Sequence, residues 1–304
     1  MFGKPTILKL NICRIYHHIY TPENHNNNIK IKFQKRNNKM AFFSLFLFPS
    51  PPSLFIMALS IIILLSLTIS GYTEMNGKQK QYAKFFDTSS SKKEENNKLL
   101  SRNGMLVFYT PSFIVCLAAL TILPHQDLRV IMVEYVLTLH FFKRILEVLF
   151  VHKFSGFMTV DAAITIGVSY CVSTATMIYA QYLSQELPEP SVDLKYVGLV
   201  VFLIGITGNF YHHYILSNLR KKGDKEYKIP KGGLFDLIIC AHYFFEIVAF
   251  IGVLCISQTM FTLCFTLGTI FLLMGRSHAT REWYISKFGE KFRKDIKAII
   301  PYLF

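Results

Sequence analysis

The sequence predicts an all-α fold, an integral membrane bundle of about seven transmembrane helices. Of the 304 residues, 52% are hydrophobic and only 17% are charged, and the mean hydropathy is +0.34. Charged residues make up about a quarter of an average soluble domain. Several apolar segments approach the roughly 20 residues that a helix needs to cross a bilayer. Ionisable residues lie inside some of these segments, as expected where polar groups face a bundle interior.

The predicted spans follow one another with polar loops between them. They cover about 53–71, 106–123, 129–150, 157–181, 195–216, 236–255 and 258–275. Three prolines at 49, 51 and 52 separate the first span from the apolar residues that precede it. The first span therefore begins after these prolines.

The start of the chain differs from the rest in composition. Residues 1–39 contain eight Lys or Arg residues and a single acid, without apolar periodicity, and predict a disordered basic extension. We interpret Met40 as an alternative start, so that this extension would be absent from the native protein. A first helix and a polar loop occupy 40–104, and a catalytic transmembrane domain is predicted over 105–304.

Loop charges predict the orientation. The loops 72–104 and 217–233 and the tail after 275 are basic, whereas the loop 182–194 has three acids and no basic residue. Basic loops stay on the cytosolic side, so the C-terminus is expected in the cytosol. The net charge of +14 is spread over short loops, which suits a nucleotide phosphate better than nucleic acid.

The third span ends in a cluster of ionisable residues. His140, Arg144 and Glu147 share one helix face at i, i+4 and i+7, and Lys143 lies four residues before Glu147. An interfacial cluster whose long side chains reach the headgroups is the alternative. Because His140 and Arg144 lie deeper in the span, we favour a function for them.

The fifth and sixth spans add further polar residues. Asn209 and Arg220 recur on one face of the fifth span, with an interhelical polar contact as the alternative. In the sixth span, His242 and Glu246 are stacked four residues apart, and a membrane glutamate needs a partner such as an arginine. Tyr243 could donate a proton to a substrate oxygen, or it is a belt tyrosine at the interface. No metal site is expected, because no carboxylate lies at ligand spacing from the histidine pair 212–213.

A set of motifs in the C-terminal half carries a family resemblance. These motifs are Gly208-Asn209 with Leu219-Arg220, Tyr227-x-Ile229-Pro230-x-Gly232-Gly233-Leu234-Phe235, His242-Tyr243-x-x-Glu246, Trp283-Tyr284-x-x-Lys287-Phe288 and Lys297-Ala298-x-Ile300-Pro301. Together they resemble the steroid 5α-reductase family, which includes steroid, polyprenol and very-long-chain enoyl-CoA reductases. The end of the third span, residues 139–155, looks closest to the enoyl-CoA reductase branch.

The resemblance implies an enzyme of the endoplasmic reticulum membrane that uses NADPH to reduce a C=C bond conjugated to a carbonyl in a lipid. Carried over by motif, the cofactor-binding residues would be Asn209, Arg220, His242, Glu246, Arg276 and Tyr284, and Arg144 suits the phosphates by its charge. In the family, a tyrosine follows the histidine of the third span and acts on the substrate carbonyl. Here Phe141 stands in that position and cannot donate a proton. Tyr243, Lys143 or His140 would have to supply it, and Tyr243 is the preferred candidate.

Two substrates and one non-enzymatic reading stay open at this point. The family's general label favours a 3-oxo-Δ4 steroid, whereas the third-span motif favours a trans-2-enoyl-CoA. Phe141 also motivates a non-catalytic family member that binds NADPH or lipid. A transporter has no support beyond the number of spans.

Overall fold

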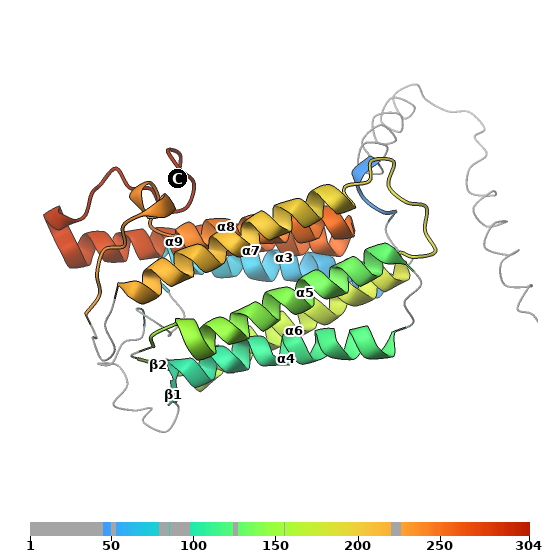
Figure 1. Ribbon diagram of the computed structural model, residues 1–304, viewed down its shortest axis with the longest axis horizontal. Helices are drawn as coiled ribbons and strands as arrows, with labels where there is room; N and C mark the ends of the chain where they lie inside the picture. Colours follow the sequence, from blue (N-terminus) through green and yellow to red (C-terminus); the bar gives the residue numbers. More distant parts are fainter. Residues whose placement is uncertain are drawn as a thin grey trace, which may run out of the picture. The chain divides into compact units, whose positions relative to one another are not determined.

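The computed structural model describes residues 45–49, 53–78, 85, 98–123, 127–154, 156–219 and 226–304. From Phe46 on they form one compact unit, in which long helices lie side by side (Figure 1). Its α-helices, within the described ranges, are α3 (Leu54–Met75), α4 (Ser101–Ile122), α5 (Leu128–Leu146), α6 (Val160–Leu183), α7 (Lys195–Asn218), α8 (Ala241–Ser257) and α9 (Met260–Phe288). Each predicted span coincides with one of these helices, so the predicted all-α membrane bundle is confirmed.

Most of these helices have the length and composition of membrane spans. Five of them, α3, α4, α6, α7 and α9, are long and apolar enough to cross a bilayer. Helix α8 is apolar but has only 17 residues, and α5 has four charged residues among its 19. The charges on α5 include Lys143 and Arg144, which lie in its last turn.

Several predicted boundaries were wrong by a turn or more: α3 ends at Met75 rather than 71, and α4 begins at Ser101 rather than 106. Helix α8 begins at Ala241 rather than 236, because Gly233–Asp236 forms a separate 3₁₀ turn, η5. Helix α9 continues to Phe288 rather than ending near 275, because its last turns pack against the chain's C-terminal segment. Apolar length locates the part of a helix inside the bilayer, but a helix can continue beyond it.

The helices form two groups that lie one above the other in Figure 1. In one group α3 packs against α9 and α7 against α8, and in the other α4 packs against both α5 and α6. The contact between α3 and α9 is especially close. A Cβ added to Gly71 or to Gly275 would meet the backbone of the facing helix. Small residues allow such an approach between membrane helices, and here it brings Glu74 and Arg276 together.

A short two-stranded antiparallel sheet joins the starts of α4 and α6. Strand β1 (Lys98–Leu100) pairs antiparallel with β2 (Phe157–Thr159). Helix α5 is extended at its other end by a π-helical turn, η4 (Glu147–Val151). Both features lie at the same end of the bundle as the last turns of α9 (Figure 1).

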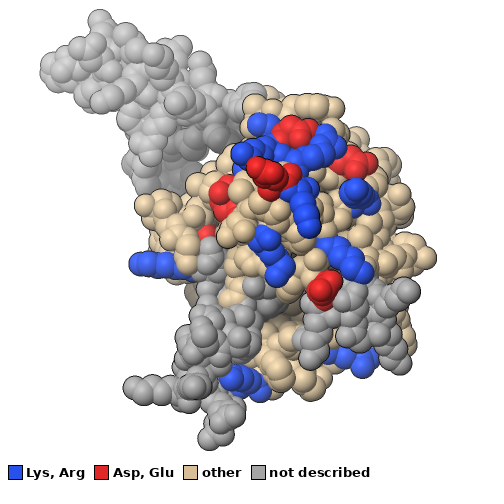
Figure 2. Space-filling view, turned by 90° about the vertical axis from the view of Figure 1, so that its left-hand side faces the viewer, with Lys and Arg blue, Asp and Glu red and all other residues tan. Residues whose placement is uncertain are grey.

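The chain after α9 folds back onto this end. A 3₁₀ turn, η6 (Gly289–Lys291), ends the helix. The Ile239 and Cys240 backbone N–H groups then donate to the Lys297 and Ala298 carbonyls at 2.9 and 3.1 Å. Figure 2 looks onto this face, where blue Lys and Arg side chains gather among fewer red acidic ones.

A buried arginine holds the opposite end of the bundle together. Nη1 of Arg129 donates to the Ile256 carbonyl at 2.7 Å and to Oε1 of Gln258 at 2.9 Å. Its Nη2 donates to Glu189 at 2.7 Å and to Asp193 at 2.8 Å. Gln258 adopts a left-handed conformation (φ 50°) at the end of α8. Arg129 thus links α5, the α6–α7 loop and the α8–α9 turn.

Candidate active site

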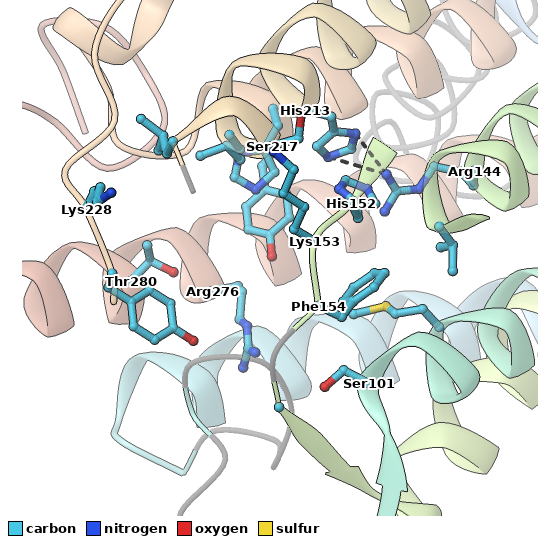
Figure 3. A pocket seen from close by; sticks show the side chains of 18 of the residues that line it. Ser101, Arg144, His152, Lys153, Phe154, His213, Ser217, Lys228, Arg276 and Thr280 are labelled. Carbon is cyan, nitrogen blue, oxygen red and sulfur yellow. Dashed lines mark hydrogen bonds between the residues drawn. The ribbon is translucent and has the colours of Figure 1, made fainter. Parts of the chain in front are cut away.

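A cavity of about 440 Å³ lies at the end of the bundle that carries η4 and the C-terminal segment. Its walls come from α4, α5 with η4, α7, α8 and α9, and from the chain just before η5 (Figure 3). Basic, histidine and aromatic side chains dominate the lining: Tyr109, Arg144, His152, Lys153, Phe154, His213, Tyr227, Lys228, His242, Tyr243, Arg276 and Tyr284.

Arg144 is the centre of a buried charge network. Its Nη1 donates to Oε2 of Glu147 at 2.9 Å, and its Nη2 donates to the Tyr109 hydroxyl at 2.5 Å. Oε1 of Glu147 lies 2.7 Å from Nζ of Lys143 and 3.0 Å from Nδ1 of His213. Figure 3 shows Arg144 beside His213 and His152. The guanidinium is therefore fixed in place before any ligand binds.

The π-helical turn η4 connects Glu147, which belongs to this network, to His152. The His152 backbone N–H donates to the Glu147 carbonyl five residues earlier, at 2.8 Å. One π turn often marks a functional site, because it rotates the following side chains relative to an α-helix. His152 lies just beyond the span, and its ring centre is 4.7 Å from that of His213. Burial, together with the charge of Arg144, lowers the pKa of His152 to about 4.

Glu147, His152 and His213 each bring one potential ligand atom within 4.8 Å of the others. Two cations already contact the Glu147 carboxylate, Lys143 and Arg144. Their positive charge opposes the binding of a metal cation. The cluster is better suited to an anion or a polar neutral group.

Arg276 is held by a residue from α3. Its Nη1 donates to Oε2 of Glu74 at 2.5 Å, and both side chains are at most 4% exposed. The guanidinium carbon also lies 4.2 Å from the centre of the Phe85 ring. Sequence reasoning missed Glu74, because a single acid at the end of an apolar span has no motif around it.

The predicted site residues separate into those that line the cavity and those behind its wall. Arg144, His242, Tyr243, Arg276 and Tyr284 line it. The side chains behind the wall are His140, Lys143, Asn209 and Glu246. Arg220 lies outside the described residues.

Asn209 acts as a link between three helices. Its Nδ2 donates to the His242 carbonyl at 2.7 Å, and its Oδ1 accepts a short hydrogen bond from Lys143. Glu246 is 6% exposed and interacts electrostatically with Lys143 and Arg144. His140 packs between Phe141 and Phe250, with ring centres 5.1 Å apart in both pairs.

Aromatic residues cover the outer part of the cavity. The rings of Tyr227 and Trp283 lie 4.8 Å apart, edge to face. The Tyr284 hydroxyl donates to the Lys228 carbonyl at 3.4 Å. Because these contacts join α9 to the segment before η5, they hold that segment beside the cavity.

Residues 158–304 match the profile of a known family, described as 3-oxo-5-alpha-steroid 4-dehydrogenase. This similarity covers 147 of the 304 residues, just under half of the chain. The predicted family resemblance is thereby confirmed. The family domain supplies α6–α9, with His213, His242, Arg276 and Tyr284. Glu74, Tyr109 and Arg144 come from helices that precede it.

Curated relatives come from two branches of this family. The chain is 41% identical over 107 residues to steroid 5-alpha-reductase DET2 of Gossypium hirsutum, covering 35% of this chain and 42% of the relative. It is 42% identical over 108 residues to human 3-oxo-5-alpha-steroid 4-dehydrogenase 1, covering 36% and 41%. A very-long-chain enoyl-CoA reductase of Dictyostelium discoideum is 35% identical over 177 residues, covering 55% of each. The chain thus spans about two fifths to just over half of these relatives' length.

Proposed function

We propose that this protein is a membrane-bound, NADPH-dependent reductase of a C=C bond conjugated to a carbonyl in a lipid, a 3-oxo-Δ4 steroid. The main support is the preorganised Arg144 network, which lines a cavity together with apolar residues such as Met105 and Val148. A phosphorylated cofactor and a lipid can meet only where charged and apolar surfaces adjoin. The steroid reductase relatives add support for the reaction class.

The lining fits a phosphorylated dinucleotide. Nε of Arg144 is buried and has no hydrogen-bond partner among the described residues, so an oxygen of a ligand would satisfy it. Lys153, Lys228 and Arg276 add cations around the cavity, and charge-assisted hydrogen bonds to phosphate are strong. Tyr227 and Tyr284 offer flat apolar faces for the ring systems.

In this proposal Arg144, His242, Arg276 and Tyr284 would contact the cofactor, with Arg220 as a further candidate. Asn209 and Glu246 would support them from behind, because Asn209 fixes the His242 backbone and Glu246 interacts electrostatically with Arg144. When bound, NADPH would supply the hydride. The protein's own tasks are then to orient the lipid, exclude water and place a proton donor at the carbonyl oxygen.

The sequence does not identify which residue donates the proton to the carbonyl oxygen. Of the three predicted candidates, Tyr243 lines the cavity, whereas Lys143 and His140 lie behind its wall. Lys143 is bound to Glu147 and Asn209, and His140 is enclosed by apolar rings. Tyr243 is accordingly the preferred donor within the predicted set.

A trans-2-enoyl-CoA of very-long-chain fatty acid elongation is the second candidate substrate. It is favoured by the enoyl-CoA reductase relative, whose similarity covers more of the chain than that of the steroid reductases. The exposed basic residues 287, 291, 293 and 294 near the cavity end would suit the phosphates of coenzyme A. These charges also support placing this end of the multi-pass protein in the cytosol; the endoplasmic reticulum membrane is what the family resemblance implies.

NADPH oxidation by the membrane-expressed protein tests the proposal. Testosterone and a long-chain trans-2-enoyl-CoA are offered separately, and products are identified by mass spectrometry. Product from testosterone supports the steroid reductase, and product only from the enoyl-CoA replaces it with the second candidate. Tight NADPH binding with neither product would instead favour a non-catalytic family member.

A further inference from the structure

Tyr109 on α4 joins the polar cavity to the apolar core. Its side chain lines the cavity although the residue is only 5% exposed. The hydroxyl accepts a hydrogen bond from Nη2 of Arg144 at 2.5 Å, and the guanidinium carbon lies 4.7 Å from the ring centre. The ring itself packs edge to face on Phe108, at 6.0 Å.

Tyr109 also lies close to Phe141, the residue that stands where the resembled family has a tyrosine and that cannot donate a proton. The ring of Tyr170, on α6, is 5.9 Å from that of Tyr109 and 6.0 Å from that of Phe141. Tyr109 and Phe141 therefore flank one aromatic ring and belong to the same buried apolar cluster. The hydroxyl of Tyr109 is the polar group at this boundary that contacts Arg144.

The surroundings of Tyr243 are different. Its ring lies 4.2 Å from that of His242 and packs on the cluster of Ile239, Cys240, Tyr284, Phe292 and Ile296. This cluster forms the cap made by α9 and the C-terminal segment. Tyr243 therefore faces the part of the cavity where the proposed cofactor would enter, rather than the apolar bundle.

We propose that Tyr109 is the catalytic hydrogen-bond donor and proton source for the substrate's carbonyl oxygen. The inference rests on the proposed function. A phenol that accepts one hydrogen bond can donate another through its own hydrogen. Arg144 would hold the cofactor through Nε and Tyr109 through Nη2, so the donor would be fixed next to the bound dinucleotide.

The reaction balances with this donor. Hydride adds to the β-carbon, the C=C electron pair moves toward the α-carbon–carbonyl bond, and the carbonyl electron pair moves to oxygen. That oxygen takes the Tyr109 proton, and the resulting phenolate keeps its charge-assisted hydrogen bond to Arg144. A proton from water then reaches the α-carbon, and the enol proton returns to Tyr109. The sum is one hydride and one proton added across the double bond.

The test compares three tyrosine-to-phenylalanine variants in lipid nanodiscs. Tyr109→Phe and Tyr243→Phe remove the two competing hydroxyls. Tyr135→Phe is the matched control, because Tyr135 lies on α5 and is 61% exposed. For each variant, kcat is measured with the substrate that the wild-type protein reduces, and NADPH affinity is measured by fluorescence. A third readout is the infrared carbonyl stretch of the bound, ¹³C-labelled saturated product.

General acid catalysis contributes about 10²- to 10⁴-fold, so Tyr109→Phe should lower kcat by that factor. NADPH affinity should stay within about threefold, a difference below 1 kcal/mol. The carbonyl stretch should move to higher frequency in Tyr109→Phe alone, because a hydrogen bond to the carbonyl is lost. Tyr135→Phe should match the wild-type protein in all three readouts.

Two results would overturn the inference while the proposed function stands. One is wild-type kcat in Tyr109→Phe with turnover lost in Tyr243→Phe, which would make Tyr243 the donor. The other is weakened NADPH binding in Tyr109→Phe with an unchanged carbonyl stretch, which would mean that Tyr109 only positions Arg144. A wild-type protein that reduces neither substrate would instead refute the proposed function itself.

Discussion

Replacing Arg129 by methionine should destabilise the bundle from the end opposite the cavity. Methionine replaces the unbranched part of the side chain but makes none of the four hydrogen bonds of the guanidinium. The Arg129 side chain is fully buried, whereas those of Glu189 and Asp193 are 48% and 37% exposed. These two carboxylates would regain water, so each would lose about 1 kcal/mol or less.

The buried partners dominate the expected loss. The Ile256 carbonyl would lose this donor in the protein interior, at a cost of about 1–3 kcal/mol. Gln258 would lose less, because its Oε1 also accepts from the Leu194 backbone N–H at 2.9 Å. Together with the carboxylates, the loss comes to about 2–5 kcal/mol. For a chain of this size it lowers the melting temperature by roughly 4–20 °C.

Thermal unfolding in detergent can be followed with a thiol-reactive dye, because Cys116 and Cys240 are buried in the folded protein. Arg293→Met is the matched control: Arg293 pairs with Asp295 at 2.5 Å, but its side chain is 62% exposed. Arg129→Lys should fall between the two, since an ammonium cannot reproduce the planar fork of hydrogen bonds. Equal melting temperatures for Arg129→Met and Arg293→Met would refute the reasoning.

Three further predictions concern the cavity end. Arg276→Ala should weaken NADPH binding by tenfold or more and substrate binding little, because it removes a phosphate partner; unchanged NADPH affinity by fluorescence titration would exclude Arg276 from the cofactor site. Glu74→Gln should lower the melting temperature without NADPH and increase the upward shift that NADPH causes, since a phosphate would then be the counter-charge of Arg276; equal shifts in both proteins would contradict this. The third concerns His152, whose folded-state pKa of about 4 lies below the ordinary 6.5. Its stabilising contribution is present above pH 6.5 and is lost as the pH falls toward 4, because only the unfolded chain takes up the proton in this interval. His152→Gln should therefore flatten the decline of the melting temperature between pH 6.5 and 4, and an identical decline would argue against His152 as its source.

The number and order of the helices could be predicted because hydropathy is a local property. Each span is a run of apolar residues, and the bilayer sets its minimum length. The exact ends depend on tertiary contacts instead. Helix α9 continues past Arg276 because its last turn packs Tyr284 against Phe292, with ring centres 5.8 Å apart. Nothing in the hydropathy of residues 276–288 indicates this contact.

The residues of the candidate site divide in the same way, into those that local motifs reveal and those that only tertiary contacts reveal. The motifs led to His242, Arg276 and Tyr284, because these residues stand in recognisable local patterns. Tyr109 and Glu74 are isolated polar residues in apolar runs, and each gains meaning only through a partner far away in the chain. Glu74 lies next to Arg276 because glycines allow α3 and α9 to pack closely. Such proximity is a property of the fold and leaves no local trace in the sequence.

The origin of the residues around the cavity bears on how the substrate should be assigned. The matched family domain begins at residue 158 and brings the side that would hold the cofactor, with His242, Arg276 and Tyr284. Tyr109 and Phe141 lie before that boundary, on α4 and α5, as does Arg144, which the proposed function assigns to the cofactor. Under the proposed function, the cofactor would constrain the first side, whereas Tyr109, Phe141 and their neighbours on α4 and α5 would contact the lipid. Identity within the C-terminal half therefore supports the hydride chemistry more strongly than it supports a steroid. Exchanging residues on α4 and α5, rather than on α7–α9, is the change expected to alter which lipid is reduced.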